Sequence, residues 1–547
     1  MSDLDNIRRR VEAKELREED YATINAMIDS YVTLYHAVGD KAATIARLRK
    51  LCFGSKTEKT AAVLGTSSAD PTATTSEAAS EESEEASNAK SGGGESRGKG
   101  HGRNGADRYT GAEKIEVPHP TLQPGDACPE CEKGTVYEAK PKTLVRLVGQ
   151  PPIGGKVYYL QKLRCGLCGQ IFTAPTPEAA GEEKYDATVP AMIALLKYGS
   201  GMPFNREERL QGMVGVPLPA STQWDLVHTL AEHAEPVYEE LIREAAQGDV
   251  VHNDDTTARI LESMGRRAEQ FATDEKKKGR KGLFTSGIVS TREDRRIALF
   301  FTGHNHAGEN LTHVLSRRAA ELDAPIQMCD ALSRNVCSGN TVAWGSKNIP
   351  AELKTIVAHC LAHGRRQFVD VADSFPEECG HVLKALAIIY KNDADSRELK
   401  HSPQERLAHH QTHSRPTMTE LKVWLTQQLE DRLVERNSSL GGAIVYMLKH
   451  WDRLTLFLRV PGAPLDNNIC ERALKKAILH RKNALFYKTH RGAHVGDLFM
   501  SLIHTCELGG MNPFDYLTAL ERHAAAVAAN PPAWLPWTYQ ETLASAP

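Results

Sequence analysis

The sequence of 547 residues predicts a multidomain α+β protein, for three reasons. A chain this long exceeds what one hydrophobic core usually supports, so it should divide into several domains. Apolar strand-like segments at 248–261, 282–290 and 295–303, a helical pattern at 307–321 and a further strand ending at Asp330 predict one sheet with a helix among its strands. Amphipathic helical patterns fill much of the remaining sequence.

The bulk composition points to a cytoplasmic protein. Hydrophobic residues make up 41% of the chain and charged residues 25%, which is typical of globular domains. The net charge of −3 means that a nucleic-acid partner would have to meet local basic patches. No apolar run is long enough to span a membrane, and the polar N-terminus is unlike a signal peptide. Eleven cysteines predict thiols plus a metal site rather than a disulfide framework.

The first 110 residues predict two regions without a large core. Residues 1–60 are expected to be helical, with apolar residues at heptad spacing such as Ile24, Tyr31 and Val38. This pattern fits a short coiled coil or helical hairpin that self-associates and, equally well, an amphipathic helix packed on its own chain. Residues 61–110 have too few apolar side chains to fold and predict a disordered linker. Its basic second half suits either phosphate contact or plain solvation.

Residues 111–178 predict a zinc ribbon. Two Cys-x-x-Cys pairs, Cys128 with Cys131 and Cys165 with Cys168, supply four thiolates at the spacing of a tetrahedral Zn²⁺ site, and alternating β-like segments connect them. With all four positions taken by sulfur no position is open for a reactive water. We therefore expect one structural Zn²⁺.

Residues 179–247 predict a helical block. Helices at 189–198 and 205–213 are followed by a glycine turn and a long helix, for which we expect Ser221 to be the cap. This outline is typical of a DNA-binding helix-turn-helix, although any helical hairpin shares it.

Three acids are candidates for a catalytic metal site. The strand and helix order of 248–340, completed by a helix in 461–525, is that of an RNase-H-like core. Asp254 lies in one strand, Asp330 ends another and Glu471 begins the late helix, so three carboxylates could hold two Mg²⁺ or Mn²⁺ ions. Each acid also has a simpler interpretation: a strand end, a helix N-cap, and a capping-box partner of Asn468.

The segment 341–460 predicts a helical insertion in this core, and 526–547 a C-terminal tail. Within the insertion, His359, Cys360 and His363 lie close in sequence, which allows a further metal site but does not favour one. Arg365 and Arg366 suit DNA phosphates or acids on their own helix surface. Trp451 is expected in the core.

The helix that begins at Glu471 continues with positive charge. Its basic residues are Lys475, Lys476, Arg481 and Lys482. If the glutamate binds metal, this run is placed to grip the phosphates of the DNA being cut.

Several segments together resemble the insertion-sequence-66 family of bacterial DDE transposases. They include "LPASTQW", "VHNDDT", "IQMCD", "CLAHGRRQF", "HSRP", "LDNNICERALKKAILHRKNALF" and "SLIHTCELGGMNPFDYL", and the four cysteines resemble the family's zinc module. The resemblance implies that Asp254, Asp330 and Glu471 are the metal-binding triad. This chain departs from the family pattern at Asp255, where glutamate is usual, and in "ALSRN" after Asp330, where glycine and an aromatic residue are usual.

These observations predict a Mg²⁺-dependent transposase that cleaves DNA at element ends and transfers the strand to a target. Its expected partners are double-stranded DNA, further copies of itself as a dimer or higher oligomer, and accessory proteins of the same element; it would associate with the nucleoid when acting. Two other classes stay open: an inactive or repurposed zinc-containing DNA-binding protein, and an RNase-H-like nuclease that cleaves without joining ends.

Overall fold

The computed structural model describes most of the chain from residue 152 onward. The described residues are 20–21, 24, 123–126, 135, 137, 152–164, 171–181, 183–264, 282–336 and 355–545. The chain forms two compact units, 78–154 and the remainder, and the larger unit contains most of the described residues. Cys128, Cys131, Cys165 and Cys168, the linker at 61–110 and nearly all of the heptad segment lie outside the described residues.

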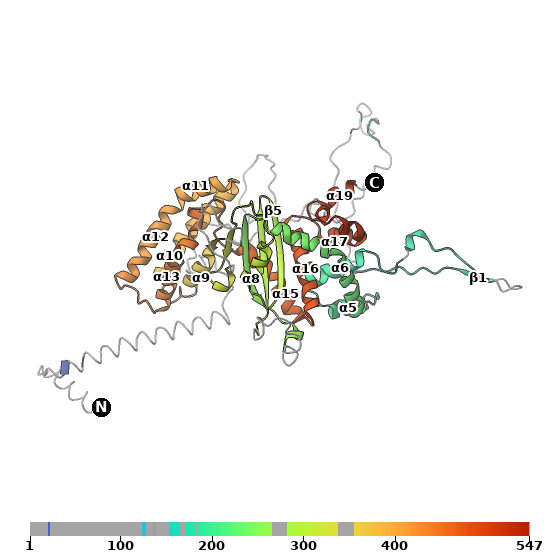
Figure 1. Cartoon of the computed structure of the whole chain (residues 1–547), viewed down its shortest axis with the longest axis horizontal. Helices are drawn as coiled ribbons and strands as arrows, with labels where there is room; N and C mark the ends of the chain where they lie inside the picture. Colours follow the sequence, from blue (N-terminus) through green and yellow to red (C-terminus); the bar gives the residue numbers. More distant parts are fainter. Residues whose placement is uncertain are drawn as a thin grey trace. The chain divides into compact units, whose positions relative to one another are not determined.

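A five-stranded mixed sheet is the centre of the larger unit (Figure 1). Its strands are β3 (Val250–Thr257), β4 (Phe284–Arg292), β5 (Arg295–Gly303), β6 (Ile326–Cys329) and β7 (Ile356–His359). The spatial order is β5-β4-β3-β6-β7. β3, β4 and β5 are mutually antiparallel, whereas β6 and β7 run parallel to β3. The four predicted strands are present, and the mixed α/β class is confirmed.

Helices cover both faces of this sheet. α8 (Ala307–Leu315) and α15 (Asn468–Ala484) both contact β3 and β4. Asn310 of α8 donates to Ser286, whereas a Cβ on the next residue, Gly287, would lie 3.0 Å from Leu474 of α15. Because consecutive strand residues point to opposite faces, α8 and α15 lie on opposite sides of the sheet. Glycine at 287 gives α15 the room to approach β4.

The outer edge of β5 is covered by α16 (His490–Leu508). Backbone N–H groups of β5 donate to side chains on α16 that are one helical turn apart: Ala298 to Thr505 at 3.1 Å, Phe300 to Ser501 at 3.0 Å and Thr302 to Asp497 at 2.6 Å. An unpaired strand edge would otherwise be a template for pairing with another chain. Polar side chains of α16 therefore satisfy the outer backbone N–H groups of β5, as a sixth strand otherwise would.

The block before the sheet is helical, as predicted. It consists of α4 (Thr188–Ala194), a π-helical turn η3 (Leu195–Gly199), α5 (Phe204–Met213) and α6 (Ala220–Ala245). Gly215, with φ +80°, lies in the turn before α6, where a left-handed conformation favours glycine. The expected cap at Ser221 is wrong: α6 begins at Ala220 with Pro219 at its N-cap position, and no side chain caps it.

Helices of the insertion gather on the side of the sheet away from α6, α16 and α17 (Figure 1). They are α9 (Leu361–Val369), α10 (Pro376–Glu398), α11 (Pro403–His413), α12 (Arg415–Glu430), α13 (Ser439–Lys449) and α14 (Trp451–Leu454). They share one buried core with β6 and β7, and Trp451 belongs to it, as expected. β7 falls inside the segment assigned to the insertion, 341–460, so the sheet continues past the predicted boundary and the helices begin at α9.

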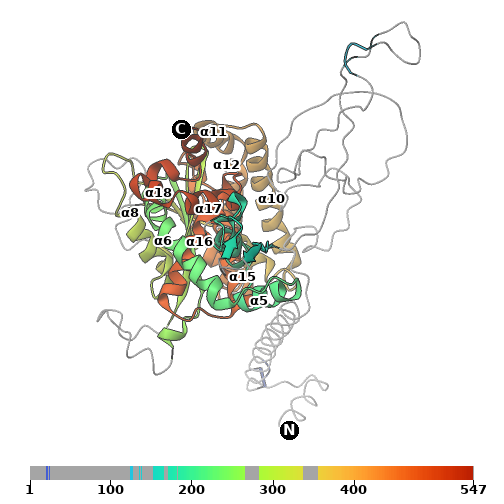
Figure 2. The same ribbon diagram turned by 90° about the vertical axis from the view of Figure 1, so that its right-hand side faces the viewer.

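The C-terminal residues fold back on α6 (Figure 2). This part comprises α17 (Pro513–Arg522), α18 (Ala524–Ala529) and α19 (Tyr539–Ser545). Trp534, Leu535 and Tyr539 are buried. The segment predicted as a tail from residue 526 is therefore packed structure up to residue 545. A short antiparallel pair, β1 (Lys162–Arg164) with β2 (Ile171–Thr173), lies in the segment predicted as the ribbon.

Single-turn 3₁₀ helices join several of these elements. They are η2 (Glu178–Ala180), η4 (Leu261–Ser263), η7 (Ser333–Asn335), η8 (Leu456–Leu458) and η9 (Pro531–Trp534). Of these, η7 directly follows β6 and its last residue reaches the candidate site.

Candidate active site at the carboxyl ends of the parallel strands

Asp254 and Asp330 lie at the same level on neighbouring strands. His252 pairs in parallel register with Met328, and the same register continued by two residues aligns Asp254 with Asp330. Cys329 likewise pairs with His359, which aligns Asp330 with Cys360. Adjacent strands lie about 4.8 Å apart, so side chains at these positions are neighbours. The sheet thus places two predicted acids side by side.

One amide joins the two aspartates. Nδ2 of Asn335, the last residue of η7, donates to Oδ1 of Asp330 at 2.6 Å and to Oδ1 of Asp254 at 3.0 Å. The backbone oxygen of Asn335 accepts from Asn253 and Gln327, both at 2.7 Å, which fixes its position. Sequence reasoning missed Asn335, although it lies in "ALSRN", the stretch that departs from the family pattern. Its hydrogen bonds leave Oδ2 of each aspartate for another partner.

The environment of Asp254 opposes its negative charge. The pKa of its carboxyl is raised to about 7, mainly by burial and in addition by the charges of Asp330 and Asp255, which together outweigh the lowering effect of hydrogen bonds from the Asp255 N–H and Asn335. No basic side chain is among these influences. An acid that is disfavoured as an anion and faces another acid is typical of a site that a cation completes.

Asp255 belongs to the opposite face of the sheet. It pairs in register with Ser286, on the α8 side, whereas Asp254 pairs with Gly287, on the α15 side. His306, at the start of α8, lies 2.8 Å from its carboxylate, and Arg334 lies 3.8 Å away. Asp255 therefore has basic neighbours within the fold, whereas Asp254 faces Asp330. The two adjacent acids, which are hard to tell apart in the sequence, have different surroundings in the structure.

Glu471 lies in the first turn of α15 but does not cap it. The N-cap residue is Asn467, no side chain caps the helix, and Asn468 bonds instead to Asp466 through its backbone N–H at 3.1 Å and its side chain at 2.9 Å. The predicted capping box of Asn468 with Glu471 is therefore wrong. The glutamate side chain remains available for another role.

Cys360 and His363 are the neighbours of the Glu471 carboxylate. Cys360 is the N-cap residue of α9 and His363 lies in its first turn. Oε1 of Glu471 lies 3.7 Å from Nδ1 of His363, and the ligand atoms of all three residues lie within 4.8 Å of one another. Since Cys360 follows β7 at the level of Asp330, Glu471 stands on the β7 side of the aspartate pair. The third acid comes to the same end of the sheet.

His359 does not join this group. It is the last residue of β7, its ring lies 5.1 Å from that of His450, and burial lowers its pKa to about 3. His359 and His363 lie close in sequence but belong to different elements, because β7 ends at His359 and α9 begins at Leu361.

The basic residues predicted to contact DNA divide into two groups. Lys475 and Lys482 are exposed on α15. Lys476 is 2.8 Å from Glu507, Arg481 bonds to Thr256 at 3.1 Å, and Arg365 is buried. Arg366 is half-buried. Two lysines are therefore directed to solvent, whereas Lys476, Arg481 and Arg365 are held within the fold.

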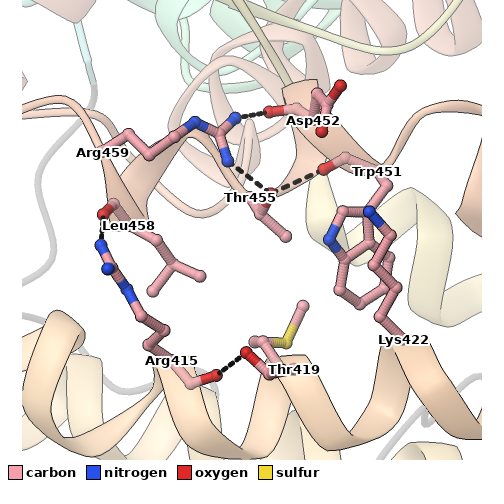
Figure 3. Close-up of a pocket in the computed structure, with 9 residues that line it drawn as sticks. Arg415, Thr419, Lys422, Trp451, Asp452, Thr455, Leu458 and Arg459 are labelled. Carbon is pink, nitrogen blue, oxygen red and sulfur yellow. Dashed lines mark hydrogen bonds between the residues drawn. The ribbon is translucent and has the colours of Figure 1, made fainter.

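A second concentration of positive charge lies in the insertion. A cavity of about 310 Å³ between α12 and the segment from α14 to η8 is lined by three cations and one acid: Arg415, Lys422, Arg459 and Asp452 (Figure 3). Arg415 donates to the backbone oxygen of Leu458 at 2.9 Å, and Lys422 Nζ lies 5.8 Å from the ring centroid of Trp451. In the part of the chain that the structure describes, none of these three cations forms a salt bridge within 4.0 Å. Such a cavity suits an anion.

Comparison with known proteins identifies the family. The model of the IS66 transposase family matches residues 183–495, which span the helical block, the sheet, the insertion and α15. The chain belongs to the IS66 family of transposases. Membership in this family points to a transposase, an enzyme class that acts on DNA.

Relatives of the chain occur in Sinorhizobium fredii (strain NBRC 101917 / NGR234). Uncharacterized protein y4hP is 26% identical over 405 residues, covering 70% of this chain and 68% of the relative. Uncharacterized protein y4jD is 35% identical over 168 residues, 30% of this chain and 32% of the relative. Uncharacterized protein y4qI is 24% identical over 358 residues, 64% of this chain and 62% of the relative. No solved structure matches the chain.

Among the described residues, no helix is a candidate for a membrane-spanning segment. None of the described helices combines the length and the apolar character that crossing a bilayer requires.

Proposed function

We propose that this IS66-family protein is a DDE transposase that cleaves DNA at the ends of its element and joins the freed strand to target DNA. The observation that carries the proposal is the pair Asp254 and Asp330, whose carboxylates accept from the same amide of Asn335, while the pKa of Asp254 is raised by burial and by neighbouring acids. Two like charges at one strand end are costly unless cations bind them. Family membership supplies the reaction class.

The sheet supports an RNase-H-like core for this chemistry. Three antiparallel strands continue into two that run parallel to the first, in the order β5-β4-β3-β6-β7, and the two aspartates lie level with each other, Asp254 within β3 and Asp330 at the carboxyl end of β6. The helix α15 then brings Glu471 to the same end. The order of β3, β4, β5, α8 and β6 is the one expected from the sequence, and β7 adds a fifth strand.

Asp254, Asp330 and Glu471 would hold two Mg²⁺ or Mn²⁺ ions. Their carboxylate oxygens are the hard ligands that these ions prefer, and the aspartates keep Oδ2 free of Asn335. Bound divalent cations would supply the Lewis acidity for phosphodiester attack by water or a 3′-hydroxyl. Asn335 positions the aspartates, and the buried strand ends limit water around them.

DNA contacts would come from outside this centre. Exposed Lys475 and Lys482 on α15, and the cationic cavity of Arg415, Lys422 and Arg459, offer unpaired positive charge for phosphates. We also propose the Zn²⁺ site at Cys128, Cys131, Cys165 and Cys168, DNA binding by α5 and α6, and assembly of two or more copies with accessory proteins. These rest on sequence patterns.

A cleavage and strand-transfer assay on DNA carrying the element's ends tests the proposal. Asp254→Asn and Glu471→Gln should each lower Mg²⁺-dependent cleavage by about 100-fold or more, because several kcal/mol of transition-state stabilisation depends on the metals. Asp255→Asn is the matched control, since its carboxylate faces α8; its activity should remain within about tenfold of wild type. Undiminished cleavage by Asp254→Asn would refute the triad. Cleavage without joining would identify a nuclease, and binding of ends without cleavage a repurposed DNA-binding protein.

A further inference from the structure

Cys360, His363 and Glu471 form a group of metal-ligand atoms beside the aspartate pair. One Sγ, one imidazole nitrogen and one carboxylate oxygen lie within 4.8 Å of one another. They come from the first turns of two helices, α9 and α15, that meet at the end of β7. Cys-x-x-His at the start of a helix is a spacing that lets both side chains reach one ion.

The sulfur is arranged to accept hydrogen bonds. The backbone N–H of Asn467 donates to Sγ of Cys360 at 3.3 Å. Cys360 is also the N-cap residue of α9, where the helix dipole favours a negative charge. The Cys360 side chain is buried, so a nearby cation would offset the cost of forming its thiolate.

The other two ligand atoms have no hydrogen-bond partner. Nδ1 of His363 and Oε1 of Glu471 are both inaccessible to solvent and unbonded, and they lie 3.7 Å apart. Buried polar atoms of this kind are rare, and an ion that binds both would satisfy them. Ligand atoms around a tetrahedral Zn²⁺ lie roughly 3.3–3.8 Å apart. The 3.7 Å between His363 and Glu471 is already in this range, and small movements would bring in the third atom, which lies within 4.8 Å of both.

The mixture of ligands favours Zn²⁺ over Mg²⁺. Thiolate and imidazole are ligands for borderline-soft ions, whereas Mg²⁺ takes oxygen. Three protein ligands leave the fourth tetrahedral position open. Binding would release the thiol proton to solvent, and His363 would use Nδ1 while Nε2 keeps its hydrogen.

We propose that Cys360, His363 and Glu471 bind one Zn²⁺, and that this ion withdraws Glu471 from the aspartate pair and thereby inhibits the Mg²⁺-dependent reaction. The site is distinct from the four-cysteine ribbon and shares only Glu471 with the Mg²⁺ centre. The inhibitory consequence rests on the proposed transposase function, whereas the binding of Zn²⁺ does not.

Zinc stoichiometry of the full, reduced chain tests the binding. After dialysis against a low Zn²⁺ concentration, Cys360→Ala and, separately, His363→Ala should each retain one fewer equivalent of Zn²⁺ per chain than wild type. Cys379→Ala, which removes a buried cysteine of α10, is the control and should retain the wild-type value. This difference does not depend on whether the ribbon binds zinc. Equal stoichiometry in wild type and both site variants, or an equal loss in Cys379→Ala, would overturn the site.

Cobalt gives an independent readout. Co²⁺ substituted into wild type should show a sulfur-to-metal charge-transfer band, part of which is absent from Cys360→Ala. A spectrum unchanged by that substitution contradicts a thiolate ligand at 360.

Inhibition is then measured within each variant, by comparing cleavage with and without added Zn²⁺ at fixed Mg²⁺. The Zn²⁺ concentration for half-inhibition should rise about tenfold or more in Cys360→Ala relative to wild type. An unchanged concentration refutes the inhibitory role. If wild type shows no Mg²⁺-dependent cleavage, the proposed function fails, and the zinc stoichiometry still decides the site.

Discussion

Two buried acid clusters in this protein are built in opposite ways. At the end of the sheet, Asp254 has Asp330 and an amide as neighbours, and its pKa is raised to about 7. In the insertion, Asp393 of α10 lies 3.1 Å from Arg397, 2.6 Å from Arg406 and 3.1 Å from His410. Burial raises the pKa of Asp393, but these partners outweigh it and lower the pKa to about 2.

The difference separates an acid that holds the fold together from one that is available to a ligand. Asp393 ties α10 to α11, and its charge is satisfied within the protein. The aspartate pair concentrates like charge instead, which is a cost to folding that a bound cation removes. Burial alone does not tell the two apart; the sign of the neighbouring charges does.

The largest expected effect concerns stability. Asp393→Asn should lower the free energy of unfolding by about 3 kcal/mol or more, because Arg406 and its neighbours lose their buried counter-charge. Asp254→Asn, measured without divalent cations, should change it by less than about 1 kcal/mol or increase it, since a like-charge contact is lost. Urea unfolding measures both, with Glu398→Gln on the exposed side of α10 as control. Equal destabilisation by the two aspartate variants would break the comparison.

Acid unfolding should show an intermediate effect. Because the folded pKa of Asp393 is depressed from its ordinary 3.8 to about 2, its contribution is fully present above pH 3.8 and is lost as the pH falls through 2. Between pH 3.8 and 2, the difference in free energy of unfolding between wild type and Asp393→Asn should therefore shrink, by no more than roughly 1.4 kcal/mol per pH unit. Urea unfolding at several pH values checks it. A constant gap down to pH 2 contradicts the assigned ion pairs.

The smallest effect belongs to the amide between the aspartates. Asn335→Ala should weaken Mg²⁺ binding about tenfold, since both carboxylates lose the donor that positions them. The Mg²⁺ dependence of cleavage measures it. Asn310→Ala removes another buried amide, on the opposite face of the sheet, and should leave the Mg²⁺ dependence unchanged. The same shift in both variants would mean that general loosening, not positioning, is responsible.

Most of the sheet could be predicted from the sequence, because each strand has its own pattern of apolar residues. Alternation and apolar runs predict β3 to β6, and Asp330 directly follows β6 as expected. β7 is only four residues long and was absorbed into the helical insertion, since a short buried strand cannot be told from a helix segment by periodicity.

The contacts around the acids were harder to predict. Asn335 meets both aspartates through a 3₁₀ turn, and Glu471 meets His363 across two helix starts. Neither contact produces a periodic pattern in the sequence from which it could be predicted. The cap predicted at Asn468 failed because Asp466 competes for the same donors. Local rules describe a helix start correctly only when no nearby acid offers a better partner.

The late position of α15 in the chain also affects when the enzyme can act. Asp254 and Asp330 are synthesised well before Glu471, and α15 packs over Gly287 of β4, which is also synthesised earlier. A growing chain on the ribosome therefore has the aspartates without the glutamate. The same holds for any product of premature termination before residue 471. In the proposed enzyme, the capacity to cut DNA is thus withheld until most of the polypeptide has been made.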